Sequence, residues 1–393
     1  MISISRLLCG LGGPQDRLRY QWRAEAETKE ELEVNLQRKP IVVWNSTKAC
    51  NLHCIHCYYT AHTKAAPHEL STEEAKAFID SLADFGVPVL LFSGGEPLMR
   101  DDLFELGAYA VERGLRTVIS TNGTLIDPLA ARRIKAARFS YVGISLDGVG
   151  ETNDRFRGMR GAYDAALHGL RNCEAAGVRT GLRLTLNRHN VRDLSDILDL
   201  LREERIPRAC FYHLVYAGRG KKMQADDLTV QESRTAVDMI FDRALAYHRD
   251  GVEIEILTVD NHADGPYLLQ RVERDQPERY DEVLSLLREN GGNASGIGIS
   301  AVDHLGYVHA DQFWQHYAFG NVRERRFGDI WVDLSDSLMA GLKDRKPLLK
   351  GRCAACRYLD ICNGNFRVRA EAVYNDVWAP DPACYLADEE IGL

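Results

Sequence analysis

The sequence has no long hydrophobic run and no strongly basic tract. No uninterrupted apolar stretch approaches the ~20 residues that a membrane helix needs. The net charge is −8 at pH 7, which disfavours a nucleic-acid-binding surface. The opening MISISRLLCGLGG has no basic start and is interrupted by Arg6, which is not typical of a signal peptide. We therefore expect a cytoplasmic protein with no membrane or nucleic-acid partner.

The first group of cysteines lacks a fourth metal ligand. Cys50, Cys54 and Cys57 follow the apolar run IVVW, and no second Cys or His pair nearby completes a zinc site. Ten cysteines in a large cytoplasmic protein favour metal binding or catalysis over structural disulfides. Three thiolates can hold three corners of an iron–sulfur cubane and leave one iron open to a non-protein ligand. The alternatives are a zinc site completed by His53 or His56, and cysteines that cluster by chance.

Short apolar runs alternate with helical patterns over the first 215 residues. The runs are Ile41–Trp44, Val87–Phe92, Thr117–Ser120, Tyr141–Leu146, Gly181–Leu186 and Ala209–Val215. The helical patterns lie near 72–85, 101–113, 127–137, 161–176 and 190–204, and Ser71 with Glu74 predicts a capping box for the first. This alternation predicts an α/β fold with a parallel sheet, right-handed crossovers and a curved, barrel-like form.

Polar sequences follow the ends of these runs. The first run leads into the cysteine loop, and SGGEP, STNGT, SLDG and TLN follow the next four. Because the carboxyl ends of parallel strands lie at the same edge of a sheet, we expect these residues to form one site.

The alternation weakens after about residue 215. DQPERYDEVLSLLREN (275–290) predicts a charged amphipathic helical region, and GIGISAVDHLGYVHA (296–310) predicts a hairpin. The chain is long enough for two domains, or for one barrel with an extension. We expect an N-terminal extension, a barrel, a helix-and-strand connection and a cluster-binding extension, at 1–38, 39–220, 221–300 and 301–393.

The cysteine motif followed by Tyr58 resembles the signature of the radical S-adenosylmethionine (SAM) family. The other motifs of residues 40–215 also occur in the order of that family. The resemblance implies a partial (β/α)6 barrel in which SAM chelates the open iron of a 4Fe–4S cluster. It implies cofactor-binding roles for Tyr58, Gly94, Gly95, Glu96, Pro97, Ser120, Asn122, Ser145, Asp147 and Arg157.

These implied roles divide among the parts of SAM. The GGEP stretch pairs with the amino group, Ser120 and Asn122 lie near the methionine end, and Arg157 binds the carboxylate. Ser145 and Asp147 lie near the ribose. The resemblance also implies that a reduced cluster, supplied by a ferredoxin- or flavodoxin-type donor, cleaves SAM to a 5′-deoxyadenosyl radical.

The second group of cysteines could hold another cluster. Cys353, Cys356, Cys362 and Cys384 supply four thiolates, which suit either a fully ligated 4Fe–4S centre or structural zinc. Their spacing resembles the auxiliary-cluster region of the SPASM/Twitch branch of the family. That branch can hold two auxiliary clusters, but here Asp311 and Phe366 stand where further cysteines are expected. We therefore expect one auxiliary cluster.

Several stretches resemble radical SAM enzymes of siroheme-dependent haem synthesis. They are the N-terminal MISISRLLCG, the cysteine-loop strand, TVDNHADGPY (258–267), VHADQFW (308–314) and CNGNFRVRAEA (362–372). The resemblance implies removal of two acetate side chains from 12,18-didecarboxysiroheme to give iron-coproporphyrin III. The related haem d1 branch implies removal of propionates from the same substrate. A SPASM-type peptide-modifying maturase and a zinc-stapled binding module remain as alternatives.

An iron tetrapyrrole with several carboxylates calls for arginines and an axial ligand or acid. Arg367 and Arg369, in strand-like alternation, are candidates for the carboxylates, with Arg219 and Arg155 behind them. The alternative is that these arginines are solvated at the surface.

His262 and His309 are candidates for the axial ligand or acid, because His is the commonest haem ligand. Each could equally be a structural histidine. Asp311, in place of a cysteine, could also face the substrate.

Overall fold

A curved sheet forms the centre of the molecule. The computed structural model describes residues 1–12, 16–20 and 31–393. Within these, the sheet has ten strands in the order β1-β8-β7-β6-β5-β4-β3-β2-β9-β10. Their bounds are β1 Ile2–Ser3, β2 Ile41–Asn45, β3 Val89–Ser93, β4 Arg116–Thr121, β5 Tyr141–Ser145, β6 Thr180–Leu186, β7 Arg208–His213, β8 Glu255–Val259, β9 Ile299–Val302 and β10 Val308–His309. Strands β2 to β8 run parallel, as does the β2–β9 pair, whereas β1 and β10 are antiparallel to their neighbours.

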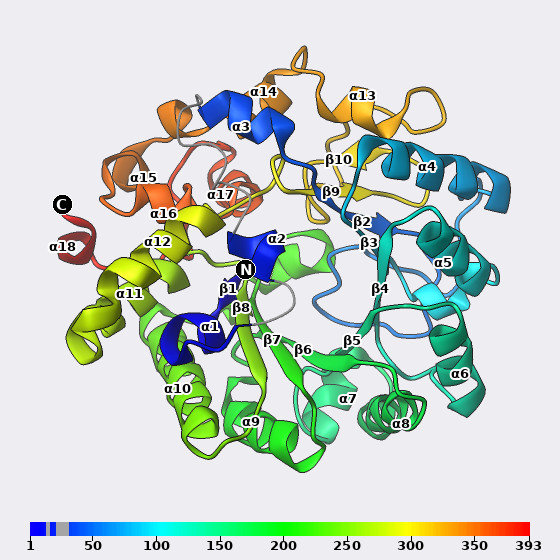
Figure 1. The fold of residues 1–393 in the computed structure, drawn as a ribbon, viewed down its shortest axis with the longest axis horizontal. Helices are drawn as coiled ribbons and strands as arrows, with labels where there is room; N and C mark the ends of the chain where they lie inside the picture. Colours follow the sequence, from blue (N-terminus) through cyan, green and yellow to red (C-terminus); the bar gives the residue numbers. More distant parts are fainter. Residues whose placement is uncertain (13–15, 21–30) are drawn as a thin grey trace.

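Helices cover the outer side of this sheet (Figure 1). Those in the first part of the chain are α1 Ile4–Cys9, α2 Asp16–Tyr20, α3 Glu31–Gln37, α4 Thr72–Phe85, α5 Leu103–Glu112, α6 Pro128–Ala136, α7 Glu151–Arg157, α8 Ala162–Ala175, α9 Leu194–Glu203 and α10 Val230–Arg249. The later ones are α11 Asp264–Asp275, α12 Tyr280–Asn290, α13 Phe327–Trp331, α14 Ser337–Lys343, α15 Gly351–Ala355, α16 Leu359–Cys362, α17 Arg367–Tyr374 and α18 Asp388–Ile391. No described helix is both long and apolar enough to cross a membrane.

The six predicted strands and the five helical patterns between them are confirmed as β2–β7 and α4, α5, α6, α8 and α9. The capping box of Ser71 and Glu74 at the start of α4 is also confirmed. The predicted weakening after residue 215 missed one further repeat, because α10 leads into β8, which adds another parallel strand. Charged residues around the short run EILTV hid this strand. The division into four segments stays a prediction, since one sheet takes strands from all of them.

The two faces of the sheet are packed differently. Alternate residues such as Leu90 and Phe92 of β3 face outward into the main core against the helices. The residues between them, such as Val89 and Leu91, face the inner side of the barrel. Leu18 of α2 packs against this inner group, so α2 lies at the amino-terminal ends of the strands. The carboxyl-terminal rim is left for the cysteine loop and its neighbours.

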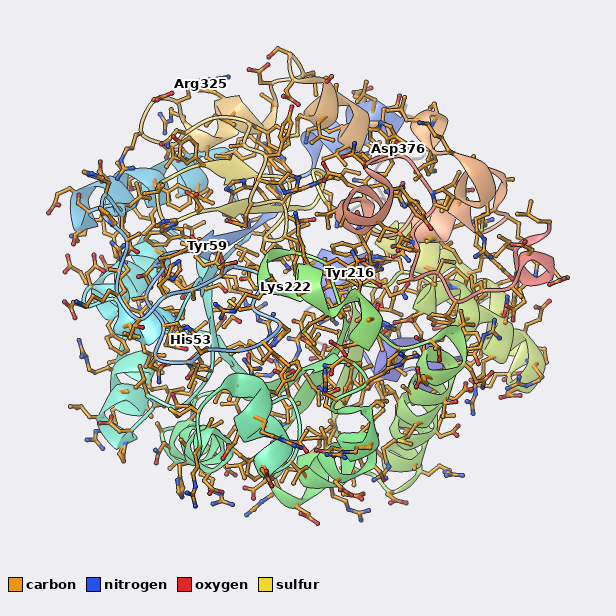
Figure 2. All side chains as sticks on the ribbon, turned by 180° about the vertical axis from the view of Figure 1, so that it is seen from behind. His53, Tyr59, Tyr216, Lys222, Arg325 and Asp376 are labelled. Atoms are coloured by element: carbon orange, nitrogen blue, oxygen red, sulfur yellow. The ribbon has the colours of Figure 1, made fainter. Side chains whose placement is uncertain are left out.

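The segment after β7 lies against the cysteine loop. Figure 2 shows its residues Tyr216 and Lys222 in the middle of the rear face, beside the chain that carries His53 and Tyr59. Gly218 (φ 55°) lies so close to the cysteine loop that a Cβ on it would be 2.3 Å from the Tyr58 carbonyl oxygen. Arg219 donates through Nε to the Cys54 carbonyl at 2.9 Å. This segment therefore fixes the outer side of the loop.

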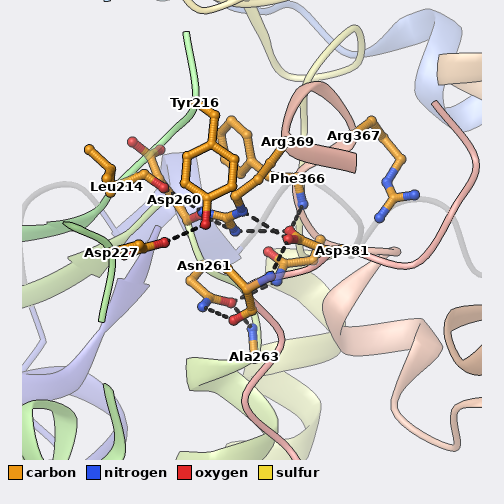
Figure 3. A network of polar contacts seen from close by, with 12 residues as sticks. Leu214, Tyr216, Asp227, Asp260, Asn261, Ala263, Phe366, Arg367, Arg369 and Asp381 are labelled. Carbon is orange, nitrogen blue, oxygen red and sulfur yellow. Dashed lines mark hydrogen bonds and ion pairs between the residues drawn. The ribbon is translucent and has the colours of Figure 1, made fainter. Parts of the chain in front are cut away.

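A buried ion pair joins the C-terminal segment to the barrel (Figure 3). Arg369 of α17 donates from Nε and Nη2 to the two carboxylate oxygens of Asp381, each at 2.8 Å, and both side chains are fully buried. Arg369 also donates to the carbonyls of Leu214 and Asp260, at the ends of β7 and β8. Burial opposes ionisation of Asp381, but the Arg369 charge outweighs it and holds the Asp381 pKa below its usual value.

We predict that Asp381→Asn destabilises the protein by about 3–5 kcal/mol, because the Arg369 guanidinium stays buried without a counter-charge. The measurement is the unfolding midpoint of anaerobically handled protein. Asp376→Asn is the control, since its pair with Lys350 is exposed and should change stability by less than about 1 kcal/mol. Equal midpoints for the two variants would contradict the role given to the buried pair.

Candidate active site at the carboxyl-terminal rim

The three cysteines of the first group lie together on the loop after β2. Cys50 and Cys54 are buried and Cys57 is partly buried in one small cluster. Backbone bonds from His53 and Ile55 to the carbonyls of Arg157 and Phe156 tie the loop to the end of α7. Burial raises the pKa of the Cys50 thiol to about 12, and the nearby Glu96, Cys54 and Cys57 charges add to this. Such thiols ionise when a positive group binds them, which fits an iron–sulfur cluster.

The glycines of SGGEP allow the chain to pass directly beneath this loop. A Cβ on Gly95 would lie 2.0 Å from the Ala49 carbonyl oxygen, and one on Gly94 (φ 126°) would lie 2.7 Å from that of Thr47. Glu96 donates its backbone N–H to Ala49 at 2.7 Å. The position just before Cys50 is therefore fixed by the backbone that follows β3.

Glu96 joins the ends of β3 and β4. Its buried carboxylate accepts hydrogen bonds from Thr121 Oγ1 at 2.7 Å, from the Asn122 backbone N–H at 2.8 Å and from Leu98 N at 3.1 Å. Burial raises its pKa, although these bonds oppose the shift. Asn122 in turn donates to Asn51 Oδ1 at 2.8 Å, and its amide nitrogen lies 4.0 Å from Cys50 Sγ.

Arg157 connects Asp147 to the cysteine loop. It forms a buried ion pair with Asp147, and its Nη1 lies 3.6 Å from Cys54 Sγ. Asp147 accepts the Thr185 backbone N–H at 2.7 Å, which fixes the turn after β5 to the end of β6. The Arg157 guanidinium therefore connects the Cys54 thiol to Asp147, and the Asp147 carboxylate joins the ends of β5 and β6.

Tyr58 connects the loop to both β2 and the C-terminal segment. Its hydroxyl lies 3.0 Å from Asn45 Oδ1 and 3.1 Å from Ser93 Oγ, at the ends of β2 and β3. Its ring packs edge-on against Phe313 at 5.3 Å. Pro97 begins the short helix after Glu96. Ser120 and Ser145 lie at the ends of β4 and β5, on the same rim.

Sequence reasoning named His56 only as a possible zinc ligand, and it missed Arg183. His56, between two of the cysteines, stacks on Phe156 at 4.5 Å, and its Nε2 lies 3.7 Å from Asp147. Burial lowers its pKa to about 4, so it is neutral at pH 7. Arg183 of β6 lies on the inner face of the barrel, with its guanidinium over the Tyr212 ring. A charged residue at an inward position of a strand was the signal that could have revealed it.

The four cysteines of the second group gather at α15, α16 and the tail. Burial raises the pKa of Cys362 well above its usual value, and the charges of Cys384, Cys353 and Cys356 raise it further. All four thiols therefore lie within electrostatic reach of one another. In the described part of the chain, no three His, Cys, Asp or Glu side chains are arranged to hold a single metal ion.

The predicted strand-like alternation of Arg367 and Arg369 is wrong, because both residues lie in helix α17. Both are also fully buried, so the surface alternative is wrong as well. Arg367 donates to the carbonyls of Val377, Ala379 and Gly364, and Arg369 pairs with Asp381. Both arginines of the RVRAE sequence can be buried on this helix, because backbone carbonyls and one carboxylate satisfy their charges.

The other predicted substrate residues lie on several elements, with His262 after β8, His309 in β10 and Asp311 after β10. His262 is buried, stacks on Phe366 at 6.3 Å and has no hydrogen bond to Nδ1 from the described residues. His309 Nδ1 lies 2.7 Å from the Tyr317 carbonyl. Asp311 accepts the Phe313 backbone N–H at 2.8 Å and the Ser295 hydroxyl, so its carboxylate fixes a turn. Arg219 donates to backbone carbonyls of the cysteine loop, and Arg155 is exposed.

Comparison with known proteins gives three kinds of match. The Radical SAM superfamily model matches residues 44–201. Fe-coproporphyrin III synthase of Methanosarcina barkeri is 61% identical over 100% of this chain and 99% of its own, and pre-heme d1 synthase of Dinoroseobacter shibae is 41% identical over 90% and 88%.

Solved structures share the fold. SAM-bound SuiB of Streptococcus suis has a TM-score of 0.69 at 18% identity, covering 89% of this chain and 78% of that one. SAM-bound anSMEcpe also has a TM-score of 0.69, at 17% identity, covering 88% and 94%. The cysteine loop, the curved parallel sheet and the full-length relatives agree, and the chain belongs to the radical SAM superfamily of enzymes.

Proposed function

We propose that this protein removes the two acetate side chains of 12,18-didecarboxysiroheme and gives iron-coproporphyrin III. The observation that carries the proposal is the end-to-end match at 61% identity to a protein named Fe-coproporphyrin III synthase. The match to a pre-heme d1 synthase is weaker, at 41%. The rim site supports the same reaction class, because its thiols and polar strand ends suit a cluster and SAM.

Cys50, Cys54 and Cys57 would hold the first 4Fe–4S cluster. When bound, the cluster supplies an electron and SAM supplies a radical that abstracts hydrogen from the substrate. The residues of the chain position these groups and keep water away from them. Burial of Cys50 and Cys54 and the neutral His56–Phe156 stack give this part of the rim little contact with solvent.

Arg157 would bind the SAM carboxylate, since a guanidinium pairs with a carboxylate through two hydrogen bonds. It already lies 3.6 Å from Cys54 Sγ, so a ligand that it holds is next to the cluster position. Asp147 holds Arg157 from the other side. The GGEP backbone, Ser120, Asn122 and Ser145 would line the rest of the cofactor, as the family motifs imply.

Cys353, Cys356, Cys362 and Cys384 would hold one auxiliary 4Fe–4S cluster. Their mutual electrostatic effect on the Cys362 pKa supports a shared group. His262, with an unpaired ring nitrogen, and His309 are proposed to face the iron tetrapyrrole. Asp311 stabilises the turn that follows His309. Arg367 and Arg369 stabilise the C-terminal segment and do not act as carboxylate ligands. A small ferredoxin- or flavodoxin-type protein would supply electrons.

We predict that anaerobic protein with SAM, a reductant and 12,18-didecarboxysiroheme forms iron-coproporphyrin III. The mass of the product measures the reaction, because acetate and propionate losses differ by one methylene each. Loss of two propionates would point instead to the reaction of the haem d1 branch. An unchanged tetrapyrrole would favour the alternative that the substrate is a peptide. The mycofactocin maturase MftC of Mycobacterium tuberculosis, 30% identical to this chain, is a relative that fits this alternative.

We predict that variants of the two cysteine groups lose different clusters, which iron and sulfide analysis can distinguish. Cys54→Ala should lose the first cluster and abolish SAM cleavage. Cys353→Ala should lose only the auxiliary cluster, keep SAM cleavage and lose turnover of the tetrapyrrole. Cys173→Ala is the control, because this buried thiol of α8 lies in the main core and should leave iron and sulfide content unchanged. Zinc in place of iron would contradict both assignments.

We predict that Arg157→Met weakens SAM binding by about 10- to 100-fold, the value of one or two charge-assisted hydrogen bonds. Equilibrium dialysis of SAM against anaerobic, cluster-loaded protein measures the change. Arg160→Met, at an exposed position three residues later, is the control and should bind SAM normally. If both variants bind SAM equally well, Arg157 does not hold its carboxylate.

A further inference from the structure

Arg183 occupies an inward position in the middle of β6. Its register neighbours are Ser145 of β5 and Cys210 of β7, and residues on either side of it alternate between the barrel interior and the helices. A Cβ on Gly143 would lie 2.7 Å from Arg183 Cδ and 3.4 Å from Cγ. The glycine therefore leaves room for the Arg183 side chain to lie across β5 inside the barrel.

The Arg183 guanidinium has no hydrogen-bond acceptor among the residues that the structure describes. Its one close partner is the Tyr212 ring, whose centroid lies 4.8 Å from Cζ. The other arginines at this end of the barrel are engaged differently. Arg157 pairs with Asp147, Arg219 donates to loop carbonyls and Arg369 pairs with Asp381. A partly buried guanidinium without an acceptor is costly unless a ligand supplies one.

A second titratable side chain, Asp260, lies within electrostatic reach of Arg183. Asp260 ends β8 in a left-handed conformation (φ 68°) and is 6% exposed. Its carboxylate accepts no hydrogen bond from the described residues, whereas its backbone carbonyl accepts one from Arg369. Asp260 and Arg183 influence each other electrostatically, but no ion pair joins them. The Arg183 guanidinium and the Asp260 carboxyl therefore have no hydrogen-bond partner among the described residues, and burial raises the pKa of Asp260 to about 7.

Both groups lie within electrostatic reach of the cysteine loop. Arg183 and Asp260 each influence the pKa of the Tyr58 hydroxyl, which is adjacent in sequence to Cys57. Tyr212 packs on the same inner side of the barrel as Arg183. A ligand group held by Arg183 would accordingly lie close to the first cluster and to SAM, where hydrogen abstraction takes place.

We propose that Arg183 binds a carboxylate arm of the tetrapyrrole inside the barrel, with its guanidinium oriented by the Tyr212 ring. The inference rests on the proposed function and adds the residue that recognises the substrate. A guanidinium fork matches a carboxylate with two parallel hydrogen bonds, and stacking on an aromatic ring fixes the plane of the fork.

The test compares binding of two probes by wild-type protein, Arg183→Met and Arg183→Lys. The probes are iron-coproporphyrin III and its tetramethyl ester in detergent micelles, titrated by absorbance under anaerobic conditions. Wild-type protein should prefer the free acid. In Arg183→Met this preference should fall by about 10- to 100-fold, with the ester bound equally by both proteins. Arg183→Lys should be intermediate, because the ammonium keeps the charge but loses the fork.

Arg192→Met is the matched control, since its side chain is 67% exposed outside the barrel. It should keep the wild-type preference. SAM cleavage without tetrapyrrole and iron content report whether each variant is correctly folded. An unchanged acid preference in both Arg183 variants would overturn the inference while leaving the proposed function intact. Failure of wild-type protein to bind or convert a tetrapyrrole would overturn the proposed function itself.

Discussion

The close approach of two backbone segments fixes the position of the cysteine loop. Gly95 lies so near the Ala49 carbonyl that no side chain fits between them, and the Glu96 N–H bonds to the same oxygen. The cysteine loop therefore begins from a rigid point, although it contains almost no regular secondary structure. The thiols lie on this loop, and Arg157 and Asn122 each contact it directly. The positions of all these groups therefore depend on the approach of Gly95 to Ala49.

Charge inside the barrel is arranged in pairs, with few exceptions. Asp381 with Arg369 is buried and satisfied, so this pair stabilises geometry and leaves little capacity for a ligand. Arg157 also pairs with Asp147, but its Nε has no hydrogen-bond partner among the described residues, which leaves it able to take a ligand. The unpaired groups are consequently informative. Burial raises the pKa of the Cys50 thiol, and the Arg183 guanidinium lies over the Tyr212 ring with no hydrogen-bond acceptor among the described residues.

The sequence predicted the strands, and the gathering of their polar ends at one edge of the sheet, because hydrophobic periodicity is local. The run Ile41–Trp44 and the SGGEP turn each contain enough pattern to be recognised without knowing their neighbours. The alternation of Arg367 and Arg369 was misleading, because a residue spacing of two says nothing about which carbonyls and carboxylates fold around the side chains. The inward position of Arg183 could have been noticed in the sequence, but the lack of a hydrogen-bond acceptor for it among the described residues could be found only in three dimensions.

Strand β2 has neighbours that come from opposite ends of the chain. Val42 pairs with Leu90 of β3 on one side and with Ser300 of β9 on the other. During synthesis on the ribosome, β2 is an edge strand until about residue 300 has emerged, and closing so large a loop is slow. The cysteine loop therefore acquires its final surroundings late, when most of the polypeptide is already made.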